Sequence, residues 1–170
     1  MCDHFQVSVA NVRIRRYRPE DRSAAMSLAP RLMIGVAPWR DADAVRRAVT
    51  GWVRDSLDGF DSEDRAVLVA DGEHGLVGLV TLSFREHFSG ETDAYVGELI
   101  VAEAEEGRGI GTLLMQGAED WARSRGLQHL TLETGAANST ARAFYASLGY
   151  LEEEVRLTKS LSSSPVEASR

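Results

Sequence analysis

An apolar strand that runs through a glycine-rich loop into an amphipathic helix limits the possible folds of this chain more than any other feature. The strand is "DAYVGELIV" (93–101), the loop is "AEAEEGRGIG" (102–111), and the helix is expected over 110–125. A nearly all-apolar strand is typical of the middle of a sheet that is covered on both faces. The helix carries a stripe of apolar or small residues at spacings of three and four, suited to packing on that sheet: Ile110, Leu113, Leu114, Gly117 and Trp121.

The remaining segments predict one mixed α/β (α+β) domain. Alternating or apolar runs predict strands, and apolar spacing with capping residues predicts helices. The further strands are expected over 12–17, 65–71, 75–84, 128–134 and 153–161, and the further helices over 21–28, 41–57 and 138–149. Trp52 and Trp121 fall on helix stripes and are expected in the core. The domain spans residues 12–161, with residues 1–11 expected as a flexible N-terminus and 162–170 as a disordered tail.

Composition excludes several classes of function. The net charge of −7 argues against nucleic-acid binding, which needs an excess of Lys and Arg, and favours cationic small molecules. The one cysteine, Cys2, allows no internal disulfide, which fits a reducing cytoplasm. No stretch approaches the ~18 consecutive apolar residues of a membrane span. The four histidines are scattered, which argues against a metal site. We therefore expect a cytoplasmic protein with no nucleic-acid, membrane or metal partner.

The glycine loop has the features of an anion site. A helix start leaves backbone N–H groups without partners, and the glycines at 107, 109 and 111 remove side chains that would keep an anion away. Arg108 adds one positive charge, while Glu105 and Glu106 precede the glycines and are expected to point to water. A tight turn with no ligand is the alternative. The loop lacks the third glycine of a dinucleotide fingerprint and the Gly-Lys-Ser/Thr of a nucleotide P-loop.

Two segments together resemble the hallmarks of the GNAT superfamily of acyl-CoA N-acyltransferases. "LIVAEAEEGRGIGTLLMQGAEDWA" is similar to that family's Gln/Arg-x-x-Gly-x-Gly/Ala loop and helix, and "LTLETGAANSTARAFYASLGY" is similar to its Asn-x-x-Ala-x-x-Phe-Tyr-x-x-x-Gly-Phe/Tyr helix. The second motif is matched by Asn138, Ala141, Phe144, Tyr145, Gly149 and Tyr150. The likeness covers about residues 12–161. It implies a GNAT-type fold, in which a central mixed, mostly antiparallel sheet is splayed at a V between its fourth and fifth strands and flanked by about four helices.

The resemblance implies acetyl-CoA as cosubstrate, held between the two splayed strands. Backbone groups of one strand would pair with the pantetheine arm, the loop amides would hold the pyrophosphate, and an amide near Leu99 or Ile100 would polarise the thioester carbonyl. The residues implied in cofactor binding are Leu99, Ile100, Val101, Gly107, Arg108, Gly109, Ile110, Gly111, Thr112, Asn138 and Tyr145.

The resemblance also implies direct attack of an amine on the thioester. Tyr145 would protonate the departing thiolate or hydrogen-bond the sulfur. A protonated amine must lose a proton first; Glu98, acting through water, is our candidate base and Glu133 the second, and the face that Glu98 takes is open. Trp39 and Phe84, with Glu133, are expected near the acceptor, together with neighbouring loop residues at 40, 87 and 88.

Two departures from the family pattern bear on the cofactor. Glu106 stands where the family usually has Gln or Arg, and Glu103 where it often has proline, so we expect weaker CoA binding or a compensating arginine nearby. The leading hypothesis is an N-acetyltransferase acting on a small-molecule or peptide amine. A non-catalytic acyl-CoA-binding module is the alternative, and an ATP-using enzyme is a third reading. The resemblance implies a possible homodimer through the last strand or the first helices.

Overall fold

A six-stranded sheet forms the centre of the protein, as seen in a computed structural model that describes residues 8, 9 and 11–161. The strands lie in chain order, and every neighbouring pair is antiparallel except the last, β5 with β6, which is parallel. The strands are β1 (Ser8–Val9), β2 (Val12–Arg16), β3 (Arg65–Gly72), β4 (Gly75–Glu86), β5 (Thr92–Val101) and β6 (Leu130–Leu132). This is the mixed, mostly antiparallel sheet that the sequence predicts.

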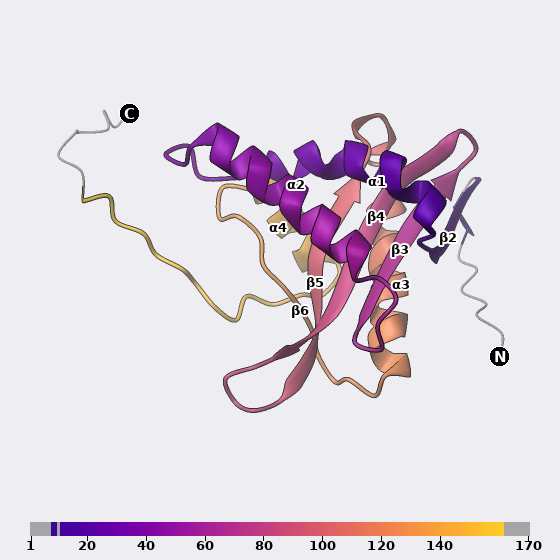
Figure 1. Cartoon of the computed structure of the whole chain (residues 1–170). Helices are drawn as coiled ribbons and strands as arrows, with labels where there is room; N and C mark the ends of the chain where they lie inside the picture. Colours follow the sequence, from indigo (N-terminus) through magenta and orange to yellow (C-terminus); the bar gives the residue numbers. More distant parts are fainter. Residues whose placement is uncertain (1–7, 10, 162–170) are drawn as a thin grey trace.

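Helices cover both faces of the sheet. They are α1 (Arg22–Leu28), α2 (Ala42–Asp58), α3 (Ile110–Ser124) and α4 (Ser139–Ser147), with short 3-10 turns η1 (Pro19–Asp21), η2 (Ala29–Met33) and η3 (Glu103–Glu105). Figure 1 shows α1 and α2 crossing one face and α3 lying behind the other. Within the described part of the chain, no helix is long and apolar enough to cross a membrane.

Local signals explain where the predicted helices begin and end. The Asp41 carboxylate accepts a hydrogen bond from the Ala44 N–H at 2.7 Å and so caps α2. The Asn138 side chain caps α4 in the same way through the Ala141 N–H at 3.1 Å. Gly126 and Gly149 follow α3 and α4 with φ of +73° and +90°, a backbone conformation that suits glycine. These boundaries confirm the predicted helices.

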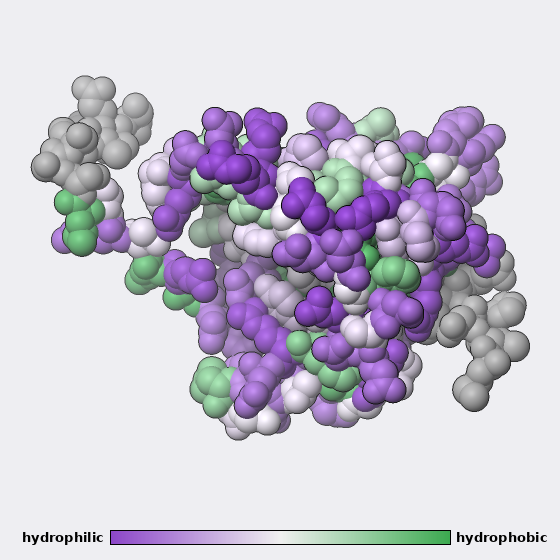
Figure 2. All heavy atoms as spheres, viewed as in Figure 1, coloured by the Kyte–Doolittle hydropathy of each residue, from purple (hydrophilic) through white to green (hydrophobic). Residues whose placement is uncertain are grey.

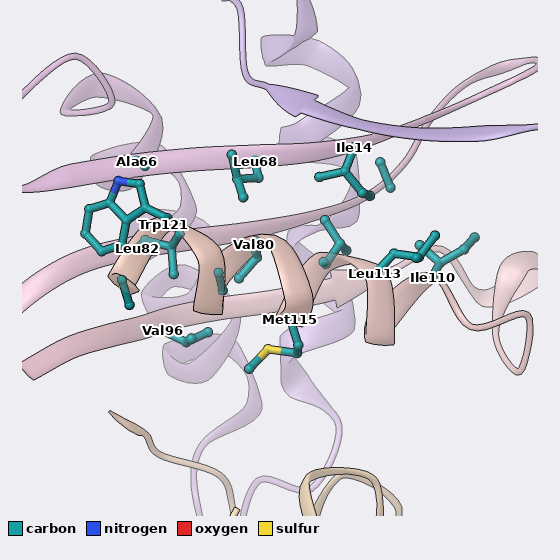
Figure 3. Close-up of a cluster of buried hydrophobic side chains, with 14 of the residues drawn as sticks. Ile14, Ala66, Leu68, Val80, Leu82, Val96, Ile110, Leu113, Met115 and Trp121 are labelled. Atoms are coloured by element: carbon teal, nitrogen blue, oxygen red, sulfur yellow. The ribbon is translucent and has the colours of Figure 1, made fainter. Parts of the chain in front are cut away.

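Two hydrophobic clusters hold the layers together. The cluster on the α3 face joins the predicted helix stripe, with Trp121 at one end, to inward-facing residues of the strands, and Figure 3 shows these side chains meeting between α3 and the sheet. The cluster on the opposite face joins α1 and α2 to β3, β4 and β5. In β5, Val96 belongs to the α3 cluster and Ile100 to the other, so this central strand is buried from both sides, as predicted.

The sheet opens between its last two strands. β5 pairs with β6 at only three positions, where Ala94, Tyr95 and Val96 lie beside Leu130, Thr131 and Leu132. β5 then continues for five more residues, 97–101, beyond this pairing. This opening is the predicted V between the fourth and fifth strands, which become β5 and β6 because the structure adds β1 before them.

Four details differ from the sequence-based expectations. The last strand, expected over 153–161, is absent, and β6 is shorter than the expected 128–134. Trp52 is 55% exposed, because Val49, Val53 and Leu57 form the row of α2 that contacts the sheet and Trp52 lies beside it. Ser8–Val9 form strand β1 within the expected flexible terminus, whereas residues 1–7, 10 and the expected tail 162–170 lie outside the described residues.

The missing strand has a physical reason. Val155, Leu157 and Leu161 lie an even number of residues apart, as on one face of a strand, but this segment pairs with no strand of the described sheet. Leu151, Val155, Leu157 and Leu161 are 77–92% exposed, and the segment stands off the body of the molecule (Figure 2). An alternating pattern specifies which side chains share a face, but a strand also needs a neighbour to bond with.

Candidate active site

A bulge in β5 sets the direction of Glu98. Val80 pairs with Leu99 and Leu82 with Val96, so the single residue Thr81 lies opposite both Gly97 and Glu98. In a regular strand, Glu98 would share the α3 face with Val96. The extra residue turns Glu98 to the face covered by α2, which answers the question that the sequence left open.

Three hydrogen bonds hold Glu98 in place. Ser56, on α2, donates its hydroxyl to Oε2 of Glu98 at 3.0 Å, and Thr81 donates its hydroxyl to the same oxygen. The Glu98 backbone N–H in turn donates to Oγ1 of Thr81 at 2.9 Å. Glu98 is only 7% exposed, and no hydrogen bond from the described residues reaches its Oε1. The carboxylate is therefore buried, fixed through one oxygen and available through the other.

A second carboxylate lies on the same face, beside a tyrosine that the sequence analysis did not single out. Arg85 donates to Oε1 of Glu133 at 2.9 Å, and its guanidinium lies 4.5 Å from the centre of the Tyr95 ring. Burial raises the pKa of the Tyr95 phenol, the charges of Glu133 and Glu98 raise it further, and the Arg85 guanidinium opposes this shift. Glu133 is thus held by an arginine, whereas Glu98 is not. A period of two places Tyr95 and Glu98 on opposite faces of β5, so the sequence held no signal that would bring Tyr95 to the site.

The glycine loop presents backbone donors at the start of α3. Gly107 and Gly109 have φ of +73° and +78°, and a Cβ at either position would meet nothing within 4 Å, so the surface of the loop is open. The first N–H to bond within the helix is that of Leu113, to the Gly109 carbonyl at 3.1 Å. The N–H groups of 110–112 therefore precede the helical ladder. This arrangement fits the diphosphate of a coenzyme A molecule.

Arginines neutralise carboxylates around this loop. Arg108 pairs with Glu105, three residues before it. Arg31, from η2, pairs with Glu106, and its other terminal nitrogen lies 3.6 Å from the carboxylate of Glu103. From the sequence we expect either weaker CoA binding or a compensating arginine near Glu106, and Arg31 is such an arginine.

Helix α4 packs against the start of α3. The Phe144 ring covers Gly111, where a Cβ would lie only 3.2 Å from its Cζ atom, so Phe144 has a packing role. Tyr145 packs between Phe144 and Tyr150, with ring centroids 5.2 and 5.9 Å away. Burial raises the pKa of Tyr145 to about 12. The phenol therefore keeps its proton at neutral pH and can act as a donor.

The segment between η2 and α2 reaches the N-terminal end of α4. Gly35 has a φ of +79°, and a Cβ there would overlap the side chain of Asn138. The Asn138 side-chain amide lies 3.5 Å from the Ile34 carbonyl. The cap of α4, one of the predicted cofactor residues, is therefore in contact with the loop that carries Trp39, which is 62% exposed.

The structure does not bring all the predicted acceptor residues together. Phe84 belongs to the α3-face cluster, and its ring lies 5.5 Å from that of Trp121. It is therefore on the opposite face of the sheet from Glu98. His87 and Phe88 stack with centroids 4.2 Å apart in the β4–β5 connection, where Phe88 is exposed.

Comparisons with known proteins agree on one family. A sequence model of the acetyltransferase (GNAT) family matches residues 33–150. Streptothricin acetyltransferase from Streptomyces lavendulae is 31% identical over 96 residues, which make up 56% of this chain and 49% of that protein, so the match spans about half of this relative's length.

Solved structures share the fold. Aminoglycoside 6'-N-acetyltransferase from Acinetobacter haemolyticus has a TM-score of 0.64 at 18% identity and covers 88% of this chain and 99% of its own. AAC(6')-Iy in complex with a CoA-based bisubstrate analogue has a TM-score of 0.63 at 16% identity and covers 90% of this chain and all of its own. At these identities the likeness concerns the fold alone.

Proposed function

Because this chain belongs to the acetyltransferase (GNAT) family, we propose that it is an N-acetyltransferase that transfers the acetyl group of acetyl-CoA directly to an amine. The observation that carries this proposal is the position of Glu98. Its carboxylate is buried and fixed by Ser56 and Thr81, on the strand that borders the V and leads into the glycine loop. A buried, oriented carboxylate next to an opening in the sheet is suited to removing a proton from a bound substrate.

The chain's own backbone would hold the cosubstrate. The N–H groups of Gly107–Thr112 would bind the diphosphate at the positive end of α3. The edge of β5 at Leu99, Ile100 and Val101 lies beyond the pairing with β6, so its peptide groups would bond the amides of the pantetheine arm as an added strand does. Asn138, at the start of α4, would contact the same arm. The loop residues fit the cosubstrate because their donors are backbone groups and the surface at Gly107 and Gly109 is open.

Two side chains would move the protons. Bound acetyl-CoA supplies a thioester carbonyl as electrophile. Glu98 accepts a proton from the attacking amine, directly or through one water, because free amines are mostly protonated at neutral pH. A backbone N–H at Leu99 or Ile100 donates to the carbonyl oxygen as negative charge develops there. Tyr145 donates its phenolic proton to the departing sulfur. Glu133 is a weaker candidate base because Arg85 already binds it.

The acceptor is proposed to be a cationic amine. Glu98 has no arginine or lysine partner among the described residues, and a carboxylate without a cationic partner suits an ammonium group. The net charge of −7 favours cationic ligands over long distances. The named sequence relative is a streptothricin acetyltransferase, which supports a small-molecule acceptor. Trp39, which is 62% exposed, would border its entrance. Phe84 is not included, because it packs with Trp121.

A thiol-release assay over a panel of amines tests the proposal. The wild-type chain should bind CoA by calorimetry and release thiol with at least one cationic amine. Glu98→Gln and Tyr145→Phe should each keep CoA binding and lower kcat by roughly 100-fold or more, as expected for loss of a general base or acid. CoA binding without turnover of any amine would overturn the enzyme hypothesis and support a non-catalytic acyl-CoA-binding module. ATP binding without CoA binding would overturn both.

A homodimer is part of the same proposal. The apolar side chains of 151–161 are exposed, and β6 is the end strand of the described sheet. A second copy of the chain would cover both if the two segments met. Light scattering should then give twice the mass of 18.6 kDa, and a chain ending at residue 150 should be monomeric; a monomeric full chain at ~100 μM would oppose the dimer.

A further inference from the structure

We propose that Arg31 is a positioning residue for the cosubstrate: by neutralising Glu106, it allows the diphosphate to approach the backbone amides of the glycine loop. This inference rests on the proposed function, since it concerns the same diphosphate site. Neither the loop motif nor the helix motif includes Arg31, which lies 75 residues before Glu106 in the chain.

The electrostatic problem is local. Three carboxylates, at Glu103, Glu105 and Glu106, directly precede the amides that would hold the diphosphate. Charges within a Debye length of ~8 Å are only partly screened, so unpaired carboxylates here would oppose an anion. Arg108 neutralises Glu105 from within the loop. Glu103 and Glu106 have no such partner within the loop, and their partner comes from η2.

The geometry makes Arg31 a fixed charge. Its side chain is 23% exposed, whereas those of Glu106 and Glu103 are 57% and 84% exposed. One terminal nitrogen pairs with Glu106, and the other lies 3.6 Å from Glu103. Nε is buried and has no hydrogen-bond partner among the described residues. The guanidinium is thus held against the protein with its charge directed at the two carboxylates.

This position distinguishes Arg31 from an ordinary surface ion pair. Such a pair contributes little to stability, and its loss changes little elsewhere. Here the arginine partner is mostly covered, and its carboxylate partner directly precedes Gly107, the first of the proposed diphosphate-binding residues. Removing the arginine leaves a negative charge beside the place where a second negative charge must bind. Removing both Arg31 and Glu106 leaves only Glu103 without this arginine, and its side chain is 84% exposed to solvent.

That difference defines the experiment, a double-mutant cycle on the full-length chain with CoA affinity measured by isothermal titration calorimetry. Arg31→Met should weaken CoA binding by about 10-fold, the repulsion expected from one unpaired carboxylate within a Debye length of the diphosphate. Arg31→Lys should retain affinity to within about 3-fold, because it keeps the charge. Combining Arg31→Met with Glu106→Gln should restore affinity to within about 3-fold of Glu106→Gln alone, because the carboxylate next to Gly107 is then uncharged.

Controls separate charge from folding. Arg22→Met removes a similar arginine, paired with Asp58 at 2.6 Å, and should leave CoA affinity unchanged. Thermal unfolding of each variant reports whether the fold is kept. The KM for S-acetylpantetheine, which lacks the diphosphate, should not respond to Arg31→Met.

Three results would overturn the inference. Unchanged CoA affinity in Arg31→Met would overturn it while leaving the proposed function intact. A double variant as weak as Arg31→Met would also overturn it, since Arg31 would then act on the ligand or the fold without Glu106. If the wild-type chain gave no heat with CoA at millimolar concentration, the proposed function itself would fall and this inference with it.

Discussion

Replacing Thr81 with valine tests whether the hydroxyl opposite the bulge in β5 holds Glu98 in its site. Valine has almost the same shape as threonine, so the substitution opens no cavity, but it removes the hydroxyl. That hydroxyl accepts the Glu98 backbone N–H at 2.9 Å and donates to the Glu98 carboxylate. Thr81 is 3% exposed, so water cannot easily replace either bond.

The expected cost follows from those two bonds. A buried N–H without a partner costs about 1–3 kcal/mol, and a hydrogen bond to a charged group contributes about 1.5–3 kcal/mol. Ser56 still donates to the same carboxylate oxygen at 3.0 Å, which offsets part of the second loss. The free energy of unfolding should therefore fall by roughly 3 kcal/mol, which in a domain of this size lowers Tm by about 6–12 °C.

Urea unfolding at pH 7 measures this loss, with Thr131→Val as the matched control. Thr131 is also a strand threonine, but its hydroxyl makes only a 3.4 Å contact with the Ala94 carbonyl, so its replacement should cost less than about 1 kcal/mol. Equal losses in the two variants would refute the reasoning. A cycle with Glu98→Gln adds a second criterion: without the carboxylate, Thr81→Val should cost less, and strict additivity would show that Thr81 does not act on Glu98.

Three further predictions concern glycines and the buried tyrosine. Burial raises the pKa of Tyr145 from 10.0 to about 12, so its protonation contributes up to about 3 kcal/mol to the free energy of unfolding below pH 10, and this contribution is lost as the pH rises to 12. The drop in the urea midpoint between pH 9 and pH 11.5 should therefore be smaller in Tyr145→Phe than in the wild type. Gly109→Ala, at φ +78° in open space, should cost about 1–2 kcal/mol from backbone strain alone. Gly35→Ala has almost the same φ but also overlaps Asn138, so a Tm no lower than that of Gly109→Ala would contradict the contact.

Features that depend on neighbours in the sequence could be predicted. Asp41 and Asn138 cap helices through backbone groups three residues later, and Gly126 and Gly149 end helices by their own conformation. The buried stripe of α3 follows from a spacing of three and four, with Trp121 at its end. Each of these signals lies within about one turn of the residue that it affects, so it can be read without knowledge of the fold.

Features that depend on distant partners could not be predicted. Trp52 fits an apolar spacing, but the width of the contact between α2 and the sheet decides that it is exposed. The segment 153–161 alternates as a strand does, but the described sheet offers it no pairing. Arg31 meets Glu106 across 75 residues. In each case the sequence specifies what a residue prefers, and packing decides whether the partner is there.

Glu98 shows how one irregularity decides the chemistry of the site. A period of two along β5 would carry Val96 and Glu98 to the same face, among the apolar residues that pack on α3. An unpaired carboxylate there would be strongly unfavourable. The bulge removes this conflict, and it depends on Gly97, where a Cβ would lie 2.9 Å from Oγ1 of Thr81. A small residue at 97 therefore leaves room for the hydroxyl that binds Glu98, and the direction of the candidate base follows from a residue that has no functional group of its own.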